Sequence, residues 1–304
     1  MTSSARIEKC LLVFIFLVLG ITAECTKSPS KLPAKLPANW NDINLARIRA
    51  YSDVDSFSFA VVGDNRGGNN VFREILKDIS RDPGILFVIN LGDIVQSATE
   101  RNYSYLFNVV NKYLTKPLLV VPGNHEVKGD SGIVRKALGK CYYSFHVGSA
   151  AFIILSCTDT RGIDPKQKVW LKKELAKFQK LRHRLIFMHY PLFDPDKFFF
   201  SHAVSKKAAL DLLTLFKKHR VTMIFAGHIH GFFEGVWDTI PFVVTGGGGA
   251  KLMGSDPDHY FFHYIKVSII NGNLTYKVCR SPPSETFRKK TRRRLFAQHL
   301  FLEP

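Results

Sequence analysis

Five stretches of this sequence place residue types that can bind divalent metals directly after an apolar run. They are Gly63-Asp64, Gly92-Asp93, Gly123-Asn124-His125-Glu126, His189 and Gly227-His228-Ile229-His230. Carboxylate, amide and imidazole side chains are common ligands of transition metals. A single Gly-Asp pair or a lone histidine is more often a turn residue or a buried structural histidine. Five such stretches in succession indicate one metal-dependent site.

The apolar runs before these residues predict the elements that position them. Residues 85–91 and 118–121 lack polar alternation, which is typical of strands buried on both faces of a sheet. A strand that ends in Pro122-Gly123 leaves its hydrogen-bonding ladder there. The side chains that follow project into the crevice beyond the strand ends, where open α/β folds bind ligands.

The rest of the chain supplies helices between these strands and further strands after them. Helical spacing of apolar residues predicts helices near residues 71–79, 103–114, 165–178 and 208–219. Two apolar runs around Gly148-Ser149 predict a hairpin, and residues 232–278 predict strands joined by turns. This order fits an α/β fold of two stacked mixed β-sheets flanked by helices.

The ordered series GD, GD, GNHE, H and GHIH resembles the calcineurin-like metallophosphoesterase family over roughly residues 56–280. The fold that this resemblance implies is the αββα sandwich of the metallo-dependent phosphatases. The implied activity is hydrolysis of a phosphomonoester or phosphodiester, so the expected partner is an anionic phosphoester substrate. The substrate itself stays open.

The resemblance also implies two divalent cations and assigns their ligands. The first ion would be held by Asp64, Asp93 and His230, and the second by Asp93, Asn124, His189 and His228. The residue types leave Mn, Fe, Zn, Co and Ni open. Two cations that share a water lower its pKa towards about 7, which supplies hydroxide as the nucleophile. His125 is expected to stabilise or protonate the leaving-group oxygen.

The first motif departs from the family pattern, because it reads Asp64-Asn65-Arg66 where most members have Asp-x-His. Arginine has no lone pair to donate to a cation, so Asn65, Gln96 or water would have to complete the first site. We interpret Arg66 as a clamp on a substrate phosphate and count it with His125 as a catalytic residue. A salt bridge to a nearby carboxylate is the plainer interpretation. The alternative function is a catalytically impaired phosphate-ligand or membrane-surface binding protein.

The N-terminus predicts an extracytoplasmic protein, secreted or periplasmic. Basic residues before residue 10, an apolar run over 10–21 too short to span a bilayer, and Ala23 before Glu24 predict a signal peptide over 1–23. Cys25 makes lipoprotein anchoring a minor alternative. A Pro/Lys-rich linker over 24–50, a phosphoesterase domain over 51–280 and a basic tail over 281–304 complete the expected organisation.

The formal net charge of +18 favours an anionic partner. From Arg280 onwards the chain carries seven basic and two acidic side chains next to an apolar segment. This tail suits an anionic membrane surface, while nucleic acid is less favoured and a solvated extension is the plainer interpretation. Four cysteines would remain after cleavage of the signal peptide, and their pairing stays open, as does the oligomeric state.

Overall fold

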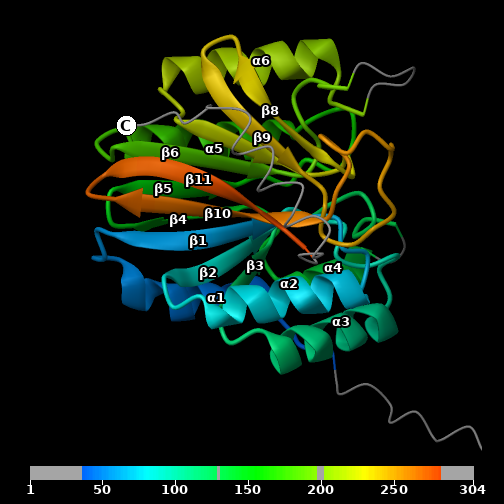
Figure 1. The fold of residues 1–304 in the computed structure, drawn as a ribbon. Coiled ribbons are helices and arrows are strands. Elements are labelled where there is room, and N and C mark those ends of the chain that lie inside the picture. The colour runs from blue at the N-terminus through cyan, green and yellow to red at the C-terminus, as the bar shows by residue number, and fades with distance from the viewer. Residues whose placement is uncertain (1–35, 129–130, 197–201, 282–304) are drawn as a thin grey trace, which may run out of the picture. The chain divides into compact units, whose positions relative to one another are not determined.

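The computed structural model describes residues 36–128, 131–196 and 202–281, all of which belong to the compact unit Pro33–Pro304 (Figure 1). The predicted signal peptide and the basic tail beyond Ser281 lie outside the described residues. Within those three ranges, no helix has both the length and the apolar character needed to cross a membrane.

The helices start where a capping side chain is available. The oxygens of Asn69, Thr99, Asp164 and Ser205 each accept a hydrogen bond from an amide in the first turn of their helix. The helices are α1 (Trp40–Ile48), α2 (Asn70–Arg81), α3 (Glu100–Tyr113), α4 (Ser131–Leu138), α5 (Pro165–Lys177) and α6 (Lys206–Lys218), with a 3-10 turn η1 (Arg49–Tyr51) after α1. α4 was not expected from the sequence.

The first sheet has the strand order β11-β10-β1-β2-β3. Its strands are β1 (Phe57–Val62), β2 (Ile85–Asn90), β3 (Leu118–Val120), β10 (His263–Ile270) and β11 (Asn273–Arg280). β1, β2 and β3 are parallel to one another, while β10 is antiparallel to both β1 and β11. The turn between β10 and β11 places Asn271 and Gly272 at positive φ, which suits a tight hairpin.

The second sheet has the order β4-β5-β6-β7-β9-β8. Its strands are β4 (Tyr143–Val147), β5 (Ala150–Ile154), β6 (His183–Met188), β7 (Met223–Ala226), β8 (Phe232–Trp237) and β9 (Ile240–Thr245). The four central strands β5, β6, β7 and β9 are parallel, and β4 and β8 close the edges as antiparallel partners. The predicted hairpin around Gly148-Ser149 is β4–β5.

The two sheets stack face to face, with helices on their outer faces (Figure 1). Aromatic rings fill the space between them: Phe59 of β1 meets Phe152 of β5 edge to face at 5.0 Å, and Phe187 stacks on Phe225 at 5.1 Å. Helices α2 and α3 cover the first sheet, and α5 and α6 cover the second. The predicted αββα sandwich is therefore confirmed.

The predicted linker over 24–50 is wrong from Leu36 onwards, because α1 is part of the folded core. The Trp40 ring is buried, stacks on Phe107 at 4.0 Å and donates a hydrogen bond to the Leu118 carbonyl at 2.8 Å. The Asn41 amide bonds both backbone groups of Val120, at 2.8 Å and 3.1 Å. α1 thus satisfies the free edge of β3, which the proline- and lysine-rich composition did not indicate.

Candidate metal centre

The five stretches singled out in the sequence meet at one edge of the sandwich. Asp64, Asp93 and Asn124 follow the carboxyl ends of β1, β2 and β3, and His189 and His228 follow those of β6 and β7. Because the strands within each set are parallel, their carboxyl ends lie side by side. The two sheets therefore deliver ligands to the same place from opposite sides.

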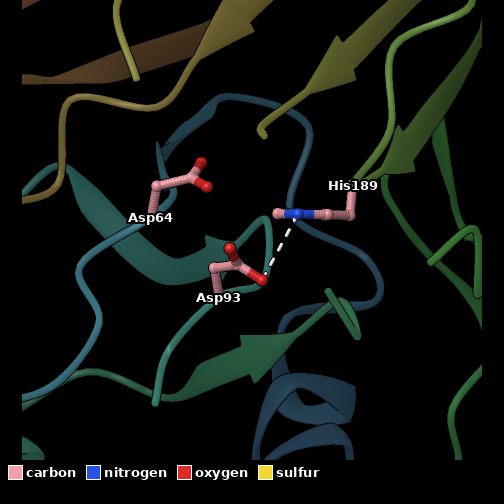
Figure 2. A group of neighbouring side chains, drawn as sticks. All are labelled: Asp64, Asp93 and His189. Atoms are coloured by element: carbon pink, nitrogen blue, oxygen red, sulfur yellow. Dashed lines mark ion pairs between the residues drawn. The ribbon is translucent and has the colours of Figure 1, made fainter. Parts of the chain in front are cut away.

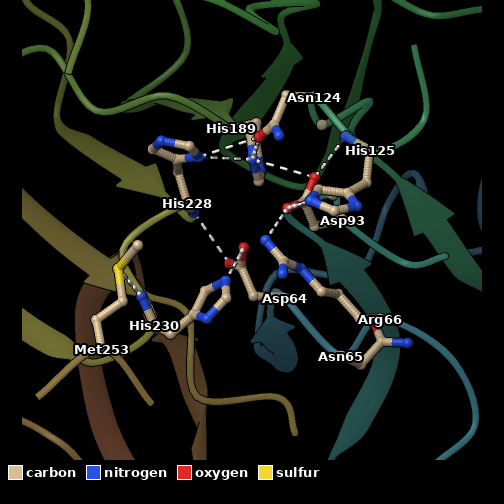
Figure 3. Close-up of polar contacts among 12 residues, drawn as sticks. Asp64, Asn65, Arg66, Asp93, Asn124, His125, His189, His228, His230 and Met253 are labelled. Atoms are coloured by element: carbon tan, nitrogen blue, oxygen red, sulfur yellow. Dashed lines mark hydrogen bonds and ion pairs between the residues drawn. The ribbon is translucent and has the colours of Figure 1, made fainter. Parts of the chain in front are cut away.

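The atoms expected to hold the second ion converge on one point (Figure 3). His189 Nε2 lies 2.9 Å from Asn124 Oδ1, 3.4 Å from Asp93 Oδ1 and 3.3 Å from His228 Nδ1. His189 Nδ1 donates to the Leu91 carbonyl at 2.8 Å, so its Nε2 carries a lone pair. A nitrogen lone pair and two oxygens that face one another are well matched to a divalent cation.

Two of the atoms expected to hold the first ion are buried without a hydrogen-bond partner. Asp64 Oδ1 and His230 Nε2 lie 3.6 Å apart, and neither forms a hydrogen bond. His230 Nδ1 donates to the Lys251 carbonyl at 2.6 Å, so here too Nε2 carries the lone pair. Buried polar atoms are rarely left unsatisfied, and a cation would satisfy both. The residues present therefore fit a metal at this position.

Asp64 and Asp93 lie near each other in the centre (Figure 2), and the charge of Asp93 affects the protonation of Asp64. Burial and the neighbouring Asp93 charge raise the pKa of Asp64 well above its usual range. Burial opposes ionisation of Asp93 as well, but His189, a hydrogen bond from the His125 amide, and the charges of His125 and Arg66 together lower its pKa. Two buried carboxylates this close are most stable with a cation or a proton between them. Asp64, Asp93 and His189 have ligand atoms within 4.8 Å of one another.

Three histidines of the centre, His189, His228 and His230, lie in surroundings that favour their neutral form. Burial lowers the pKa of His228 to about 2 and that of His230 to about 4, and it also lowers the pKa of His189. Imidazole binds metals in its neutral form. The Tyr190 ring stacks on His228 at 3.8 Å and helps to fix its orientation.

The backbone at the centre is held in a sparsely populated conformation. Within the described ranges, eight non-glycine residues have positive φ, and four of them are Asp64 (61°), Arg66 (44°), Asp93 (51°) and His228 (69°). Such conformations cost energy and persist where the surroundings impose them, often at functional sites. The tight turns after β1, β2 and β7 aim these side chains at one another.

Glu126 holds two of these turns together, a role that the sequence reasoning did not assign. One carboxylate oxygen accepts from the amides of Asp93 and Gly123 at 2.7 Å each, and the other accepts from Ile94 at 2.9 Å and Val95 at 3.3 Å. Burial and the Asp93 charge raise the pKa of Glu126 to about 8, against the effect of these amide donors. The sequence feature that could have pointed to this role is the position of Glu126 directly after His125.

His125 lies beside the carboxylate that both ions are expected to share. Its Nδ1 donates to the Gln96 carbonyl at 2.7 Å, and its Nε2 lies 3.8 Å from Asp93 Oδ2 and 3.4 Å from Lys128 Nζ. The His125 amide donates to Asp93 Oδ1 at 2.9 Å, and the ring is only 5% exposed. The imidazole is therefore fixed with Nε2 on the side of the centre (Figure 3).

A family model described as calcineurin-like phosphoesterase matches residues 57–232, more than half of the chain. The chain belongs to the calcineurin-like phosphoesterase family. This confirms the family that the motif series indicated. The matched region contains all six expected ligands together with His125 and Arg66.

Relatives of this phosphoesterase-family chain include enzymes of more than one kind. The serine/threonine-protein phosphatase CPPED1 of Rattus norvegicus is 26% identical over 197 residues, which cover 56% of this chain and 62% of the relative. A probable cyclic nucleotide phosphodiesterase of Colwellia psychrerythraea is 26% identical over 190 residues, 59% of this chain and 69% of the relative. This chain covers only 52% to 62% of the length of the CPPED1 relatives.

The fold is shared with solved structures at lower identity. GAP50, the anchor in the inner membrane complex of Plasmodium, superposes with a TM-score of 0.60 and 17% identity, covering 76% of this chain and 86% of that chain. At this identity the likeness shows the fold alone.

Arg66, the departure from the family motif, reaches into the centre. Its Nη2 lies 3.4 Å from Asp93 Oδ2, so the guanidinium faces the shared carboxylate (Figure 3). The Asn65 side chain points away from the metal centre: its amide donates to the carbonyls of Gly67 and Ile94, and its oxygen accepts from Asn90 (Figure 3). In this orientation Asn65 is not placed to complete the first metal site.

The other suggested ligand, Gln96, has an exposed side chain, and its backbone carbonyl accepts from His125. The interpretation of Arg66 as a salt-bridge partner agrees with its contact to Asp93.

Of the three described cysteines, Cys141, Cys157 and Cys279, none is in a disulfide.

Proposed function

We propose that this chain is a metal-dependent hydrolase of phosphomonoesters or phosphodiesters. The observation that carries the proposal is the meeting of unpaired acceptor atoms from both sheets, above all the buried and partnerless Asp64 Oδ1 and His230 Nε2. Groups of this kind are costly to bury unless a cation joins them. The family membership makes a phosphoester the substrate that such a centre would act on.

The proposed centre holds two divalent ions, with Asp64, Asp93 and His230 at one and Asp93, Asn124, His189 and His228 at the other. Mn, Fe, Zn, Co and Ni all suit these ligands. When bound, the ions supply Lewis acidity and lower the pKa of a bound water.

Two further side chains act on the substrate in this proposal. His125 Nε2 faces the centre while Nδ1 donates to the Gln96 carbonyl, so the doubly protonated ring is placed to give its Nε2 proton to the leaving-group oxygen. The Arg66 guanidinium, whose Nη2 lies 3.4 Å from Asp93 Oδ2, donates hydrogen bonds to phosphate oxygens and orients the ester.

The test is an assay of metal-free protein with a generic phosphomonoester and a generic phosphodiester, each without metal and with ions of Mn, Fe, Zn, Co or Ni added in turn. We expect turnover that depends on the ion and that is lost in His228→Ala, whose Nδ1 faces the second ion position. Absence of turnover with every one of the five ions, in folded protein, would refute the proposed hydrolysis.

The ion pair between Arg66 and Asp93 supports a second candidate function. A guanidinium that neutralises Asp93 takes over part of the role of a cation, as expected for a phosphate-binding protein without catalysis. Metal content separates the two candidates: about two ions support hydrolysis, whereas one or none supports binding alone.

An extracytoplasmic location, through the signal peptide over residues 1–23, remains a separate proposal. A mature N-terminus at Glu24 in secreted or periplasmic material would support it, and recovery of uncleaved protein in the cytoplasm would contradict it.

A further inference from the structure

A pocket of about 360 Å³ lies beside the metal centre, and Arg66 belongs to both. Its polar lining comes from the loops after β1 and β2 and from the first halves of α2 and α3: Arg66, Asn69, Arg73, Gln96, Asn102 and Tyr105. This volume is within the range of small-molecule sites. The lining described for this pocket contains two guanidinium groups and no carboxylate, so it is a cationic cavity next to the reactive position.

Arg66 connects the pocket with the centre. Its Nη2 faces Asp93, while its Nε is buried and donates no hydrogen bond. When Asp93 binds cations, its charge is shared with them, and the guanidinium then lacks a dedicated counter-charge. N–H groups of the Arg66 guanidinium can therefore donate hydrogen bonds to an anion in the pocket.

Arg73 is held over the pocket by neutral partners. Its Nη2 donates to the Tyr105 hydroxyl at 2.6 Å and its Nη1 to Asn70 Oδ1 at 3.3 Å, whereas its Nε is buried and donates to nothing. Across the described ranges, no ion pair involves Arg73. Tyr105 thus fixes the guanidinium without neutralising it.

The position of Arg73 in its helix is unfavourable unless an anion comes close. It lies in the fourth position of α2, where the helix dipole favours negative charge and disfavours cations by a few tenths to about 1 kcal/mol. A basic residue at this position, lining a cavity together with the half-buried Arg66, suits an anion-binding site.

We propose that this pocket binds a second phosphate group on the substrate, one that is not hydrolysed. The substrate class is then a small molecule with two phosphate groups, or a phosphate and an equally charged group, of which one lies at the ions and the other between Arg66 and Arg73. The inference rests on the proposed hydrolase function and adds substrate selection to it.

The test uses the full chain loaded with Mn²⁺ and non-hydrolysable probes. Calorimetry compares alkane bisphosphonates of increasing spacer length with the matching alkyl monophosphonates at fixed ionic strength. We expect one spacer length to bind about 10–100-fold more tightly than its monophosphonate, as for one added charge-assisted contact. Arg73→Gln should abolish this preference and leave monophosphonate affinity unchanged.

The matched control is Arg81→Gln, which removes the same charge from the exposed far end of α2. Arg73→Lys, which keeps the charge, should retain part of the preference, so an unstable Arg73→Gln protein would not end the test. Equal affinity for both probe classes at every spacer length, or equal effects of the variants at positions 73 and 81, would overturn the inference.

Turnover of the corresponding esters is measured in parallel to separate the two proposals. Hydrolysis of an alkyl monophosphate without any bisphosphonate preference would refute the second-phosphate site and leave the hydrolase proposal standing. A bisphosphonate preference that Arg73→Gln removes, without hydrolysis of any ester, would refute the hydrolase and retain the anion site.

Discussion

Lone-pair atoms of the metal centre face one another because hydrogen bonds behind them fix their orientation. The carbonyls of Leu91, Gln96 and Lys251 each accept from the Nδ1 of a histidine, which turns Nε2 of His189, His125 and His230 inward. Backbone carbonyls behind histidines in this way fix the tautomer and raise the basicity of the nitrogen in front. At the residue scale, the centre is organised for cations before any ion binds.

Replacing His125 separates proton transfer from metal binding. His125→Ala should lower turnover by about 10²–10⁴-fold, the usual contribution of a general acid. Its metal content should stay at the wild-type value, because His125 is not among the expected ligands. Parallel measurement of kcat and bound metal checks this. A variant that loses its ions together with activity would show that His125 is a ligand instead.

Replacing Arg66 with histidine, the residue most family members have there, tests what arginine does at this position. Histidine tolerates the positive φ found there and brings the lone pair that arginine lacks. Arg66→His should bind the first ion at least about tenfold more tightly. It should also raise KM, since the phosphate loses a charge-assisted donor.

Titration of metal-free Arg66→His and wild type, followed by kinetics on the loaded proteins, measures both effects. If neither the metal affinity nor KM changed, Arg66 would belong to neither the ion site nor the substrate site.

At the scale of elements, the strand ends place the ligands and α1 secures one of those strands. β3 has only three residues and pairs with β2 alone, so its other edge depends on Asn41 and Trp40 of α1. This edge leads directly into the turn that carries Asn124. Loss of α1 packing would therefore affect the site as well as the core.

Removing the anchor of α1 should destabilise the whole domain. Trp40→Ala is expected to cost about 3–5 kcal/mol of unfolding free energy, as for other buried aromatic side chains. Ile43→Ala, on the exposed face of the same helix at 55% exposure, should change it little. Denaturant unfolding of both variants measures the difference. Equal stabilities would mean that α1 is a dispensable extension, as the sequence had suggested.

The sequence predicted the elements that have strong local signals. Strands ending in Gly-Asp or Gly-His were recognisable because buried strands are uniformly apolar, and α5 was recognisable from its Asp164-Pro165 start. α1 was missed since its buried residues, such as Trp40 and Asn41, act through contacts about 80 positions away. The orientation of Asn65 away from the metal centre and the hydrogen bonds of Glu126 to two turns were missed for the same reason, because both depend on tertiary partners.

At the scale of the whole molecule, the sandwich brings two half-sites together. The first sheet carries Asp64, Asp93 and Asn124, and the second carries His189 and His228. Ions bound across this junction would hold the two sheets together and relieve the repulsion between the buried carboxylates. Metal binding should therefore stabilise the complete fold.

Stability should depend on the metal concentration by mass action. Added Mn²⁺ at about 100 times its dissociation constant should stabilise the metal-free protein by about 2.7 kcal/mol per site. Asp93→Asn, which alters the carboxylate expected at both ions, should show little of this gain. Thermal unfolding with and without a chelator measures it. Identical midpoints in both conditions would contradict a metal centre between the sheets.

The most direct test of the central claim is a titration of the metal-free chain in which bound Mn²⁺ and phosphoester turnover are followed in the same sample. The account predicts no turnover without metal and a rise that levels off at about two bound ions per chain. Turnover in metal-free protein, or ions bound at both positions without turnover, would contradict it.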